Sequence, residues 1–330
     1  MKTAFFAETS DGKFTRDTWE LLSWSRRLTG TERITALVVT PSVDGTELVR
    51  LAASGVRNIA LYEDAALDRA DIPFFAAVLE SFCARYTPDV LLGAASVLGR
   101  ALFPYAAMRM KTGLTADCTM LEADSGLLLQ TRPAIGGNIM AVIKTPRHKP
   151  QMATVRPRCA PELEPYTGGS GTVTRLSPVE KVRPAGRTRT VSSDPLARGE
   201  DIVGARRIVA VGKGIKREGN IELARRLADR LNASLGATRE VVDRGWLPYS
   251  AQIGLSGKTV VPELYIALGI SGAVQHLAGM RTARKIVAVN TDPDAAIFQI
   301  ADIGIVGDLF EVVPRLIDEF GSQVKQLSGH

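Results

Sequence analysis

The chain has 330 residues, of which 45% are hydrophobic and 23% are charged, as in ordinary globular proteins with room for two domains. No uninterrupted apolar run approaches the roughly 20 residues that cross a bilayer, so we expect no membrane insertion. The formal net charge is +6, but aromatic residues are only 6% and do not interleave with the basic ones. We therefore expect no nucleic-acid partner, and interpret the basic surface as a solvated face or a docking surface for acidic proteins.

The N-terminal residues enter a strand pattern at Thr3 without a signal or transit segment, which predicts a cytoplasmic location. Cys83, Cys118 and Cys159 lie far apart and form no Cys-x-x-Cys pair. This spacing argues against a disulfide framework, a zinc site or an iron–sulfur cluster supplied by the chain. No metal site is predicted.

Residues 1 to about 110 alternate short apolar runs with helical patterns, which predicts a parallel α/β sheet. The expected strands are Thr3–Ala7, Ile34–Val39, Asn58–Tyr62 and Asp89–Gly93. From Thr115 onward, strand-length segments follow one another without helices and predict antiparallel or mixed strands that finish the same domain. These segments are Asp117–Leu121, Leu127–Arg132, Asn138–Lys144 and Met152–Arg156.

Between Pro157 and Gly204 the residues Pro, Gly, Ser, Thr and Arg are frequent, which predicts a linker with solvated charges. We place the domain boundary near residue 200. The prediction is an N-terminal, nucleotide-binding-like α/β domain over residues 1–200 that ends in this Pro/Gly/Arg-rich linker. A second domain then covers residues 201–330.

A second alternating series begins after Arg206. Its expected strands are Ile208–Val211, a segment near Leu235–Thr238, Leu264–Gly269, Lys285–Asn290 and Ile303–Val306. Its expected helices are Asn220–Leu231 and a final helix from Leu309 to about Leu327, whose apolar residues recur every three or four positions. The series predicts a doubly wound, Rossmann-like parallel sheet with a cleft where the strand order reverses.

The strand from Leu264 runs directly into a Gly/Ser turn, and an amphipathic helix is expected to follow. Free N–H groups and the positive dipole end at a helix start predict an anion cradle, and Gly272 would let a phosphate approach closely. The turn Gly212-Lys213-Gly214 is a weaker dinucleotide signal, because Gly219 comes too late for the GxGxxG pattern.

Several ordered motifs of this second half resemble the alpha subunit of electron-transfer flavoproteins. They are Val241–Pro248, Gln252–Val260, Pro262–Met280, Asn290–Pro293 and Gly304–Phe310. The resemblance implies that the C-terminal domain binds FAD and that the first domain packs against a beta subunit. It also implies electron exchange with acyl-CoA dehydrogenases or similar flavoproteins and with a quinone-linked oxidoreductase.

The resemblance also implies contacts with the flavin half of FAD. Lys213 stands where the family has an arginine, which keeps a phosphate contact but loses the planar fork. Thr238 is implied at the pyrophosphate and Arg239 beside the isoalloxazine ring. Ile253, Gly254, Leu255 and Ser256 form the loop over the ring, where the Ser256 hydroxyl reaches the flavin N5 and Leu255 replaces a polar residue of many relatives.

His276 is implied near the flavin C2 carbonyl, where a donor would stabilise negative charge on the reduced ring. The remaining contacts that the resemblance implies face the phosphates and the AMP half. The phosphate-facing residues are Ser271, Gly272, Ala273, Val274 and Gln275. The residues of the AMP half are Asn290, Asp308 and Leu309.

Three segments of the first domain resemble a bacterial branch that contains NADH-linked, electron-bifurcating members. They are Lys111–Cys118, Ile135–Met140 and Pro150–Pro157. This branch adds NADH and ferredoxin as partners reached through the complex. No Ser/His/Asp array, HExxH motif or paired-carboxylate site is recognisable, so we expect an electron carrier that is an oxidoreductase only within a complex.

Two rival functions stay open at this stage. One is a regulatory protein that binds an adenine nucleotide without redox chemistry, and such a protein would carry AMP or ATP and no yellow colour. The other is a stand-alone NAD dehydrogenase, which the imperfect glycine pattern and the missing acid/base pair disfavour.

Overall fold

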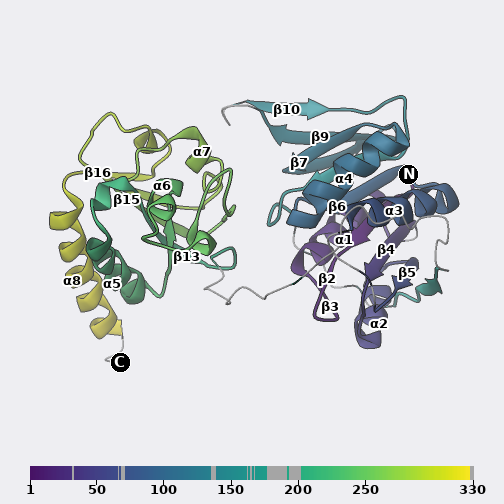
Figure 1. The fold of residues 1–330 in the computed structure, drawn as a ribbon, viewed down its shortest axis with the longest axis horizontal. Helices are drawn as coiled ribbons and strands as arrows, with labels where there is room; N and C mark the ends of the chain where they lie inside the picture. The colour runs from purple at the N-terminus through teal and green to yellow at the C-terminus, as the bar shows by residue number, and fades with distance from the viewer. Residues whose placement is uncertain are drawn as a thin grey trace. The chain divides into compact units, whose positions relative to one another are not determined.

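The computed structural model describes residues 1–31, 33–65, 67, 71–134, 139–161, 163, 166, 168–176, 192 and 202–327, with the backbone alone for 321–327. The chain divides into two units, Met1–Ser193 and Asp194–His330 (Figure 1). The boundary expected near residue 200 falls outside the described residues and stays a prediction. No helix of the described ranges is long and apolar enough to cross a membrane.

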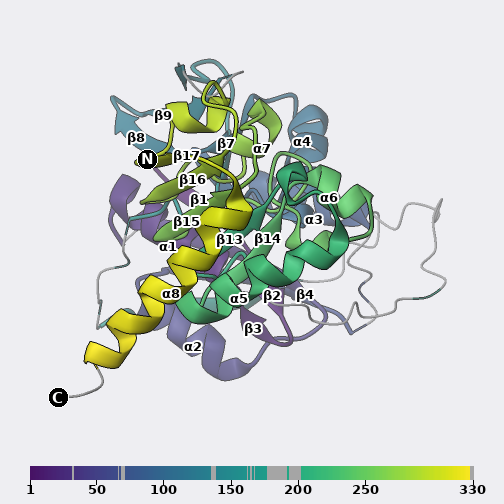
Figure 2. The ribbon, with the colours of Figure 1, turned by 90° about the vertical axis from the view of Figure 1, so that its left-hand side faces the viewer.

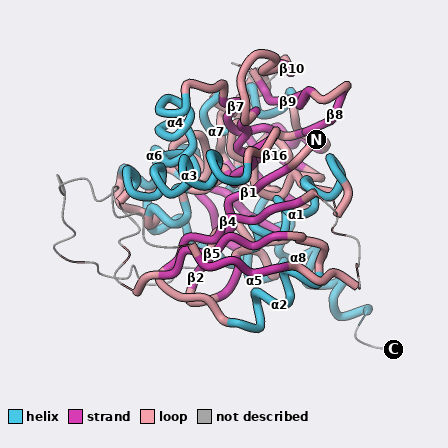
Figure 3. The backbone as a smooth tube through the Cα atoms, turned by 90° about the vertical axis from the view of Figure 1, so that its right-hand side faces the viewer, coloured by secondary structure: helices cyan, strands magenta, loops and turns pink. Residues whose placement is uncertain are grey.

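The first unit is built on a seven-stranded parallel sheet with the order β12-β5-β4-β1-β6-β11-β7. Figure 3 shows β1, β4 and β5 as neighbours. The strands are β1 Thr3–Ala7, β4 Ile34–Thr40, β5 Asn58–Glu63, β6 Val90–Ala94, β7 Leu114–Cys118, β11 Gln151–Val155 and β12 Thr172–Arg175. The first four expected strands are therefore confirmed to within one residue at each end. A short hairpin of β2 (Thr9–Ser10) and β3 (Lys13–Phe14) follows β1 and was not expected.

Helices cover both faces of this sheet. They are α1 Arg16–Thr29, α2 Gly45–Ala53, α3 Ile72–Tyr86 and α4 Val97–Met110. Side chains alternate along β1, so Phe5 packs in the core under α1 and α2, and Phe6 packs in the core under α3 and α4. A fully buried strand with helices on both faces is what the continuous apolar run Thr3–Ala7 predicts.

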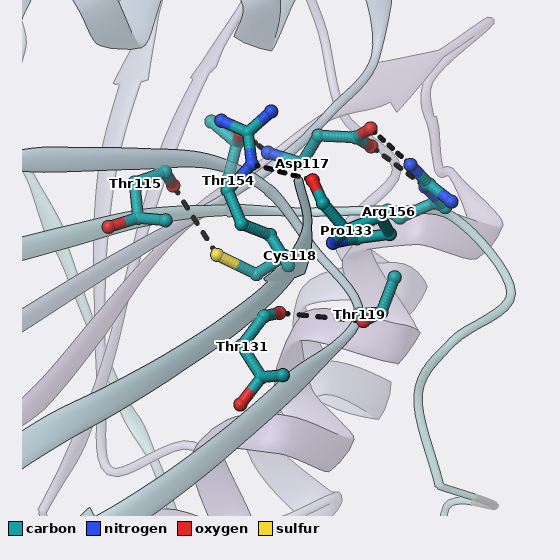
Figure 4. Close-up of polar contacts among 9 residues, drawn as sticks. Thr115, Asp117, Cys118, Thr119, Thr131, Pro133, Thr154 and Arg156 are labelled. Carbon is teal, nitrogen blue, oxygen red and sulfur yellow. Dashed lines mark hydrogen bonds and ion pairs between the residues drawn. The ribbon is translucent and has the colours of Figure 1, made fainter. Parts of the chain in front are cut away.

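The strand expected at Asp117–Leu121 is two strands, which corrects that prediction. β7 ends at Cys118 in the parallel sheet, and β8 (Met120–Asp124) begins a second sheet. Asp117 has a positive φ of 62°, and its carboxylate accepts two bonds from Arg156, at 3.1 and 2.5 Å (Figure 4). Its N–H donates to Thr154 Oγ1 at 3.0 Å. These contacts from β11 and the residue after it accompany a register shift at Asp117, beyond which Cys118 still pairs with Val155.

The second sheet of this unit is antiparallel, with the order β10-β9-β8. It is completed by β9 Leu127–Pro133 and β10 Met140–Ile143. The expected antiparallel strands are confirmed for these elements. The fourth expected segment, at Met152–Arg156, is the buried strand β11, which lies parallel between β6 and β7 instead.

The expected linker also contains a strand, which is a second correction. Thr172 and Val173 begin β12, which pairs in parallel with β5 at the edge of the large sheet, and Arg175 donates to Glu63 at 2.6 Å. The β-branched residues of this segment favour extended backbone, and the open edge of β5 supplies the N–H and C=O groups with which they pair. Residues 177–191 and 193–201 of the expected linker lie outside the described part.

The second unit has a five-stranded parallel sheet with the order β14-β13-β15-β16-β17, which confirms the expected α/β class. Its strands are β13 Arg207–Val211, β14 Ser234–Ala237, β15 Leu264–Leu268, β16 Ile286–Asn290 and β17 Ile303–Val306. The long helices α5 (Ile221–Leu231) and α8 (Leu309–Leu327) pack side by side over one face, as Figure 2 shows. The other face carries loop residues such as Ile253, Val260 and Met280.

Candidate functional site

A pocket of about 570 Å³ lies at the carboxyl edge of the second sheet. The first strand, β13, pairs with β14 on one side and with β15 on the other, and the later strands continue from β15. The strand order therefore reverses between β13 and β15. Ligands of open α/β sheets bind at such a reversal. The lining residues are Gly212, Lys213, Gly214, Thr238, Arg239, Glu240, Ile253, Gly254, Leu255, Ser256, Gly269, Ile270, Ser271, Ala273, Gln275, His276, Asn290 and Asp292.

Two glycine turns form the floor of the pocket and touch one another. The Gly214 N–H donates to the Gly269 carbonyl at 3.0 Å, and Gly269 has a φ of 60°. A Cβ added to Gly212 would lie 2.3 Å from the Gly269 oxygen. The glycines after β13 are therefore required by contact with the turn after β15, whatever ligand the pocket takes.

Two cations line the pocket, and each lies near a carboxylate. Lys213 Nζ is 3.4 Å from Glu240, and Arg239 donates to Asp243 at 3.2 Å. Glu240 also accepts from Arg244 at 3.0 Å, and this bond is the main reason that its pKa is lowered. The Lys213 and Arg239 side chains are 71% and 70% exposed, so these ion pairs are weak and both cations can turn toward an anion.

Hydrogen bonds fix the wall formed by Ile253, Gly254, Leu255 and Ser256. The Ile253 N–H donates to the carbonyl of Ala237 at 2.9 Å, and the Leu255 N–H donates to the carbonyl of Gln275 at 2.7 Å. Ser256 Oγ accepts from the side chain of Gln252 at 3.1 Å, which leaves the Ser256 hydroxyl hydrogen available to a ligand. This wall therefore offers a hydroxyl donor beside the apolar side chain of Leu255.

His276 lines the pocket, and its ring is held by partners inside the protein. Its ring is buried, Nδ1 lies 3.0 Å from the Ile253 carbonyl, and Nε2 lies 2.9 Å from the Tyr265 hydroxyl. Burial lowers the pKa of His276 to about 4, so the ring is neutral at pH 7. Both ring nitrogens have partners inside the protein, and the expected bond from His276 to a flavin carbonyl stays a prediction.

The helix expected after Gly272 is shorter than predicted, and the expected phosphate contacts of this turn stay a prediction. The helix after Gly272 is α7, a single turn over Val274–Leu277, too short for a useful dipole. The helix ends after this turn because Gly279 packs against Gly254. A Cβ added to Gly279 would lie 2.4 Å from the Gly254 nitrogen. Gly272 itself has a φ of 88°, and a Cβ there would lie 2.3 Å from the nitrogen of Ile297, so packing alone demands this glycine.

Four residues predicted for the site do not line the pocket: Gly272, Val274, Asp308 and Leu309. Val274 is an exposed residue of α7. Asp308 accepts from the Phe310 N–H at 2.9 Å at the start of α8 and pairs with Lys216. Leu309 is buried in the core under α8. The other twelve predicted residues lie around one cavity.

Six lining residues were missed: Gly212, Gly214, Glu240, Gly269, Ile270 and Asp292. Five of them adjoin a predicted residue or lie in the same strand-to-helix turn, so the position after each parallel strand was the available signal. Asp292 follows Asn290, whose side chain accepts the Asp292 N–H at 3.0 Å. Asp292 brings a second carboxylate to the pocket.

Family models match both units. The electron transfer flavoprotein domain matches residues 3–181, and the electron transfer flavoprotein FAD-binding domain matches residues 201–281. An electron transfer flavoprotein subunit alpha of Thermoanaerobacterium thermosaccharolyticum is 40% identical over 95% of this chain and 96% of its own.

Two further relatives carry names of larger enzyme systems. Subunit LctC of the lactate dehydrogenase (NAD(+),ferredoxin) of Acetobacterium woodii is 38% identical over 93% of this chain and 74% of its own. The acryloyl-CoA reductase electron transfer subunit beta of Anaerotignum propionicum is 37% identical over 95% of this chain and 94% of its own.

Proposed function

The chain belongs to the family of electron-transfer flavoprotein alpha subunits, and on that premise we propose that its second unit binds FAD in the pocket between β13 and β15. The observation that carries the proposal is the set of groups gathered at the strand reversal. Two cations, several hydroxyl and amide side chains, and apolar walls line one cavity of about 570 Å³. This combination suits a ligand with both phosphates and a flat ring.

The residues present fit the parts of FAD. Lys213 and Arg239 can pair with the pyrophosphate or with a reduced ring, since their exposed ion pairs cost little to break. Ile253, Leu255 and Ile270 offer apolar surface to a ring system. The carboxylate of Asp292 accepts hydrogen bonds, as a ribose hydroxyl requires.

When bound, FAD would supply the uptake and release of one or two electrons. The chain's own groups bind and orient the cofactor, and they set the electrostatic field around it. A cation beside the ring favours its electron-rich state, and about 1.4 kcal/mol of such preference corresponds to roughly 59 mV for a one-electron couple. In this pocket that positive charge comes from Arg239 and Lys213, because His276 is neutral at pH 7.

We further propose that the chain works in a heterodimer with a beta subunit, on which the first unit packs. In this role the pair carries electrons between flavoprotein dehydrogenases, such as acyl-CoA dehydrogenases, and a downstream acceptor. The family membership supports the heterodimer, and the relative named as an electron transfer subunit of an acryloyl-CoA reductase supports the class of partner.

The cofactor is tested by co-expressing the chain with its beta subunit and recording flavin absorption through stepwise anaerobic reduction. Lys213→Ala and Arg239→Ala should each weaken FAD binding about tenfold, because each removes one charge-assisted contact. Lys216→Ala is the matched control, since Lys216 pairs with Asp308 outside the pocket. A colourless complex that carries AMP or ATP after reconstitution with FAD would favour the non-redox rival.

A second candidate is the electron-bifurcating variant of the same function. The relative named as a subunit of an NAD(+),ferredoxin lactate dehydrogenase favours it, together with the first-domain segments noted above. Of these, residues 135–138 lie outside the described part. The purified heterodimer would be mixed with NADH, ferredoxin and the dehydrogenase partner. Ferredoxin reduction that requires the dehydrogenase substrate supports this variant, and NADH-independent electron transfer alone contradicts it.

A further inference from the structure

A buried chain of three hydrogen-bonding groups joins the centre of the second sheet to the pocket wall. Tyr265 is fully buried on β15, and its hydroxyl lies 2.9 Å from His276 Nε2. The other ring nitrogen, Nδ1, lies 3.0 Å from the carbonyl oxygen of Ile253. Tyr265 packs in the core on the face that α5 and α8 do not cover, together with Ile253.

The partners of the imidazole determine where its proton lies. A carbonyl oxygen can only accept, so Nδ1 must carry the hydrogen that bonds Ile253. In a neutral imidazole Nε2 is then the acceptor, and the Tyr265 hydroxyl is the donor. The opposite tautomer would set a lone pair of Nδ1 against the carbonyl oxygen. The lowered pKa of His276 agrees with a neutral ring.

Ile253 is the first residue of the wall, and its three neighbours in the chain continue along the pocket. Its N–H is held by the carbonyl of Ala237, and the wall is held again where the Leu255 N–H donates to the carbonyl of Gln275. The bond from His276 fixes the remaining polar group of the Ile253 backbone. The position of the wall therefore depends on the tautomer and orientation of one buried ring.

We propose that Tyr265 is a positioning residue of the pocket: its hydroxyl holds His276 as the neutral Nδ1–H tautomer, and His276 in turn fixes the wall from Ile253 to Ser256. Tyr265 acts through His276 and does not itself line the cavity. The link makes the wall part of the rigid sheet, so a ring bound against it meets a preformed surface.

The first test reads the wild-type ring directly and needs no cofactor. Imidazole nitrogen NMR of the full chain at pH 7 should show a protonated Nδ1 and a hydrogen-bonded, unprotonated Nε2 for His276. The chain has three histidines, so the His276 signals are those that remain in both His148→Gln and His330→Gln. A protonated Nε2 in the wild-type chain would overturn the proposal.

The second test removes only the hydroxyl, in Tyr265→Phe. The Nε2 resonance should lose its hydrogen-bond shift, and amide exchange of Ile253 and Leu255 should become about tenfold faster as the wall loosens. Tyr249→Phe is the matched control for the His276 link: the exposed Tyr249 donates to the Ser256 carbonyl at 2.8 Å, whereas His276 Nε2 bonds Tyr265, so the Nε2 resonance should keep its hydrogen-bond shift in this variant. Exchange at Ile253 and Leu255 that stays within twofold of wild type in Tyr265→Phe would refute the positioning role.

The third readout rests on the proposed function, since it uses FAD. The dissociation constant for FAD should rise about tenfold in Tyr265→Phe, as the wall becomes less preformed. The NMR and exchange measurements are made without cofactor. A failure of FAD binding in the wild type therefore contradicts the proposed function while the tautomer and exchange results still decide the role of Tyr265.

Discussion

The two units each carry a parallel sheet whose strand order reverses beside its first strand, and each has a cavity at that point. The cavity of the second unit, about 570 Å³, is lined by two cations and several hydroxyl and amide groups. The cavity of the first unit, about 490 Å³, is lined mainly by apolar side chains such as Phe6 and Phe75, with Glu8 as its only charged lining residue among those described. Topology places a cleft in both sheets, and the side chains make the clefts chemically different.

The carboxylate of the first cleft occupies the place where an anion would otherwise bind. Glu8 follows β1, and Ser96, the N-cap of α4, donates to its carboxylate at 2.6 Å. The Glu8 carboxylate thus supplies the negative charge that the start of α4 favours, and it would repel a phosphate there. The corresponding turn of the second sheet carries Lys213 after β13, which favours the opposite ligand charge.

We expect the largest difference between the units in the stability that each loses at low pH when a histidine is protonated. The pKa of the buried His276 is lowered to about 4, whereas an unfolded histidine takes up its proton near pH 6.5. The unfolded state therefore binds the proton first, so stability is full at pH 7 and falls as the pH drops from about 6.5 toward 4. The loss should reach about 3 kcal/mol.

Urea unfolding of the full chain between pH 7 and pH 4 measures this effect. His276→Gln should flatten the pH dependence of the unfolding free energy of the second unit. His148→Gln is the matched control, because His148 is an exposed residue of the first unit. An unchanged slope in His276→Gln would remove this difference between the units.

The glycine floor of the second cleft should give the next largest effect. In Gly212→Ala the new methyl group meets the Gly269 carbonyl, and we expect a loss of about 2 kcal/mol from overpacking and separation of the two turns. Gly219→Ala in the same unit adds a methyl group to open space and should stay within about 0.5 kcal/mol of wild type. Thermal unfolding measures the stability of both variants. Equal melting temperatures for Gly212→Ala and Gly219→Ala would contradict the prediction.

The smallest expected effect compares one ion pair from each unit. The Arg156 side chain in the first unit is only 13% exposed and holds Asp117 with two bonds. Arg156→Lys loses the two-point contact and should cost about 1 kcal/mol. Arg239→Lys replaces a side chain that is 70% exposed in its pair with Asp243 and should cost less than about 0.5 kcal/mol. Chemical denaturation measures the loss of unfolding free energy in each variant. A larger loss in Arg239→Lys than in Arg156→Lys would contradict the prediction.

The sequence was sufficient for features whose cause is local. The strand Ile303–Val306 and the helix Leu309–Leu327 were predicted with the observed ends, because a short apolar run gives way to a helical stripe within a few residues. Twelve predicted site residues lie around one cavity because parallel strands bring their carboxyl ends to one edge.

The features that were missed depend on contacts between distant segments. The irregular pairing at Asp117 involves Arg156, and the single turn of α7 requires the approach of Gly279 to Gly254. The neutral state of His276 requires Tyr265 and the Ile253 carbonyl. No periodicity or local motif records these partners, since each is set by packing across the fold.

The edge strand β12 determines how the chain can be cut for expression. Thr172, Val173 and their neighbours cover the open side of β5, and the edge groups of β5 would be exposed in a fragment that stops at Pro157. Such a fragment would present a free strand edge to other copies of itself and should form oligomers or precipitate. A fragment that continues through Leu176 keeps β12 paired with the edge of β5. It is the better starting point for preparing the first unit alone.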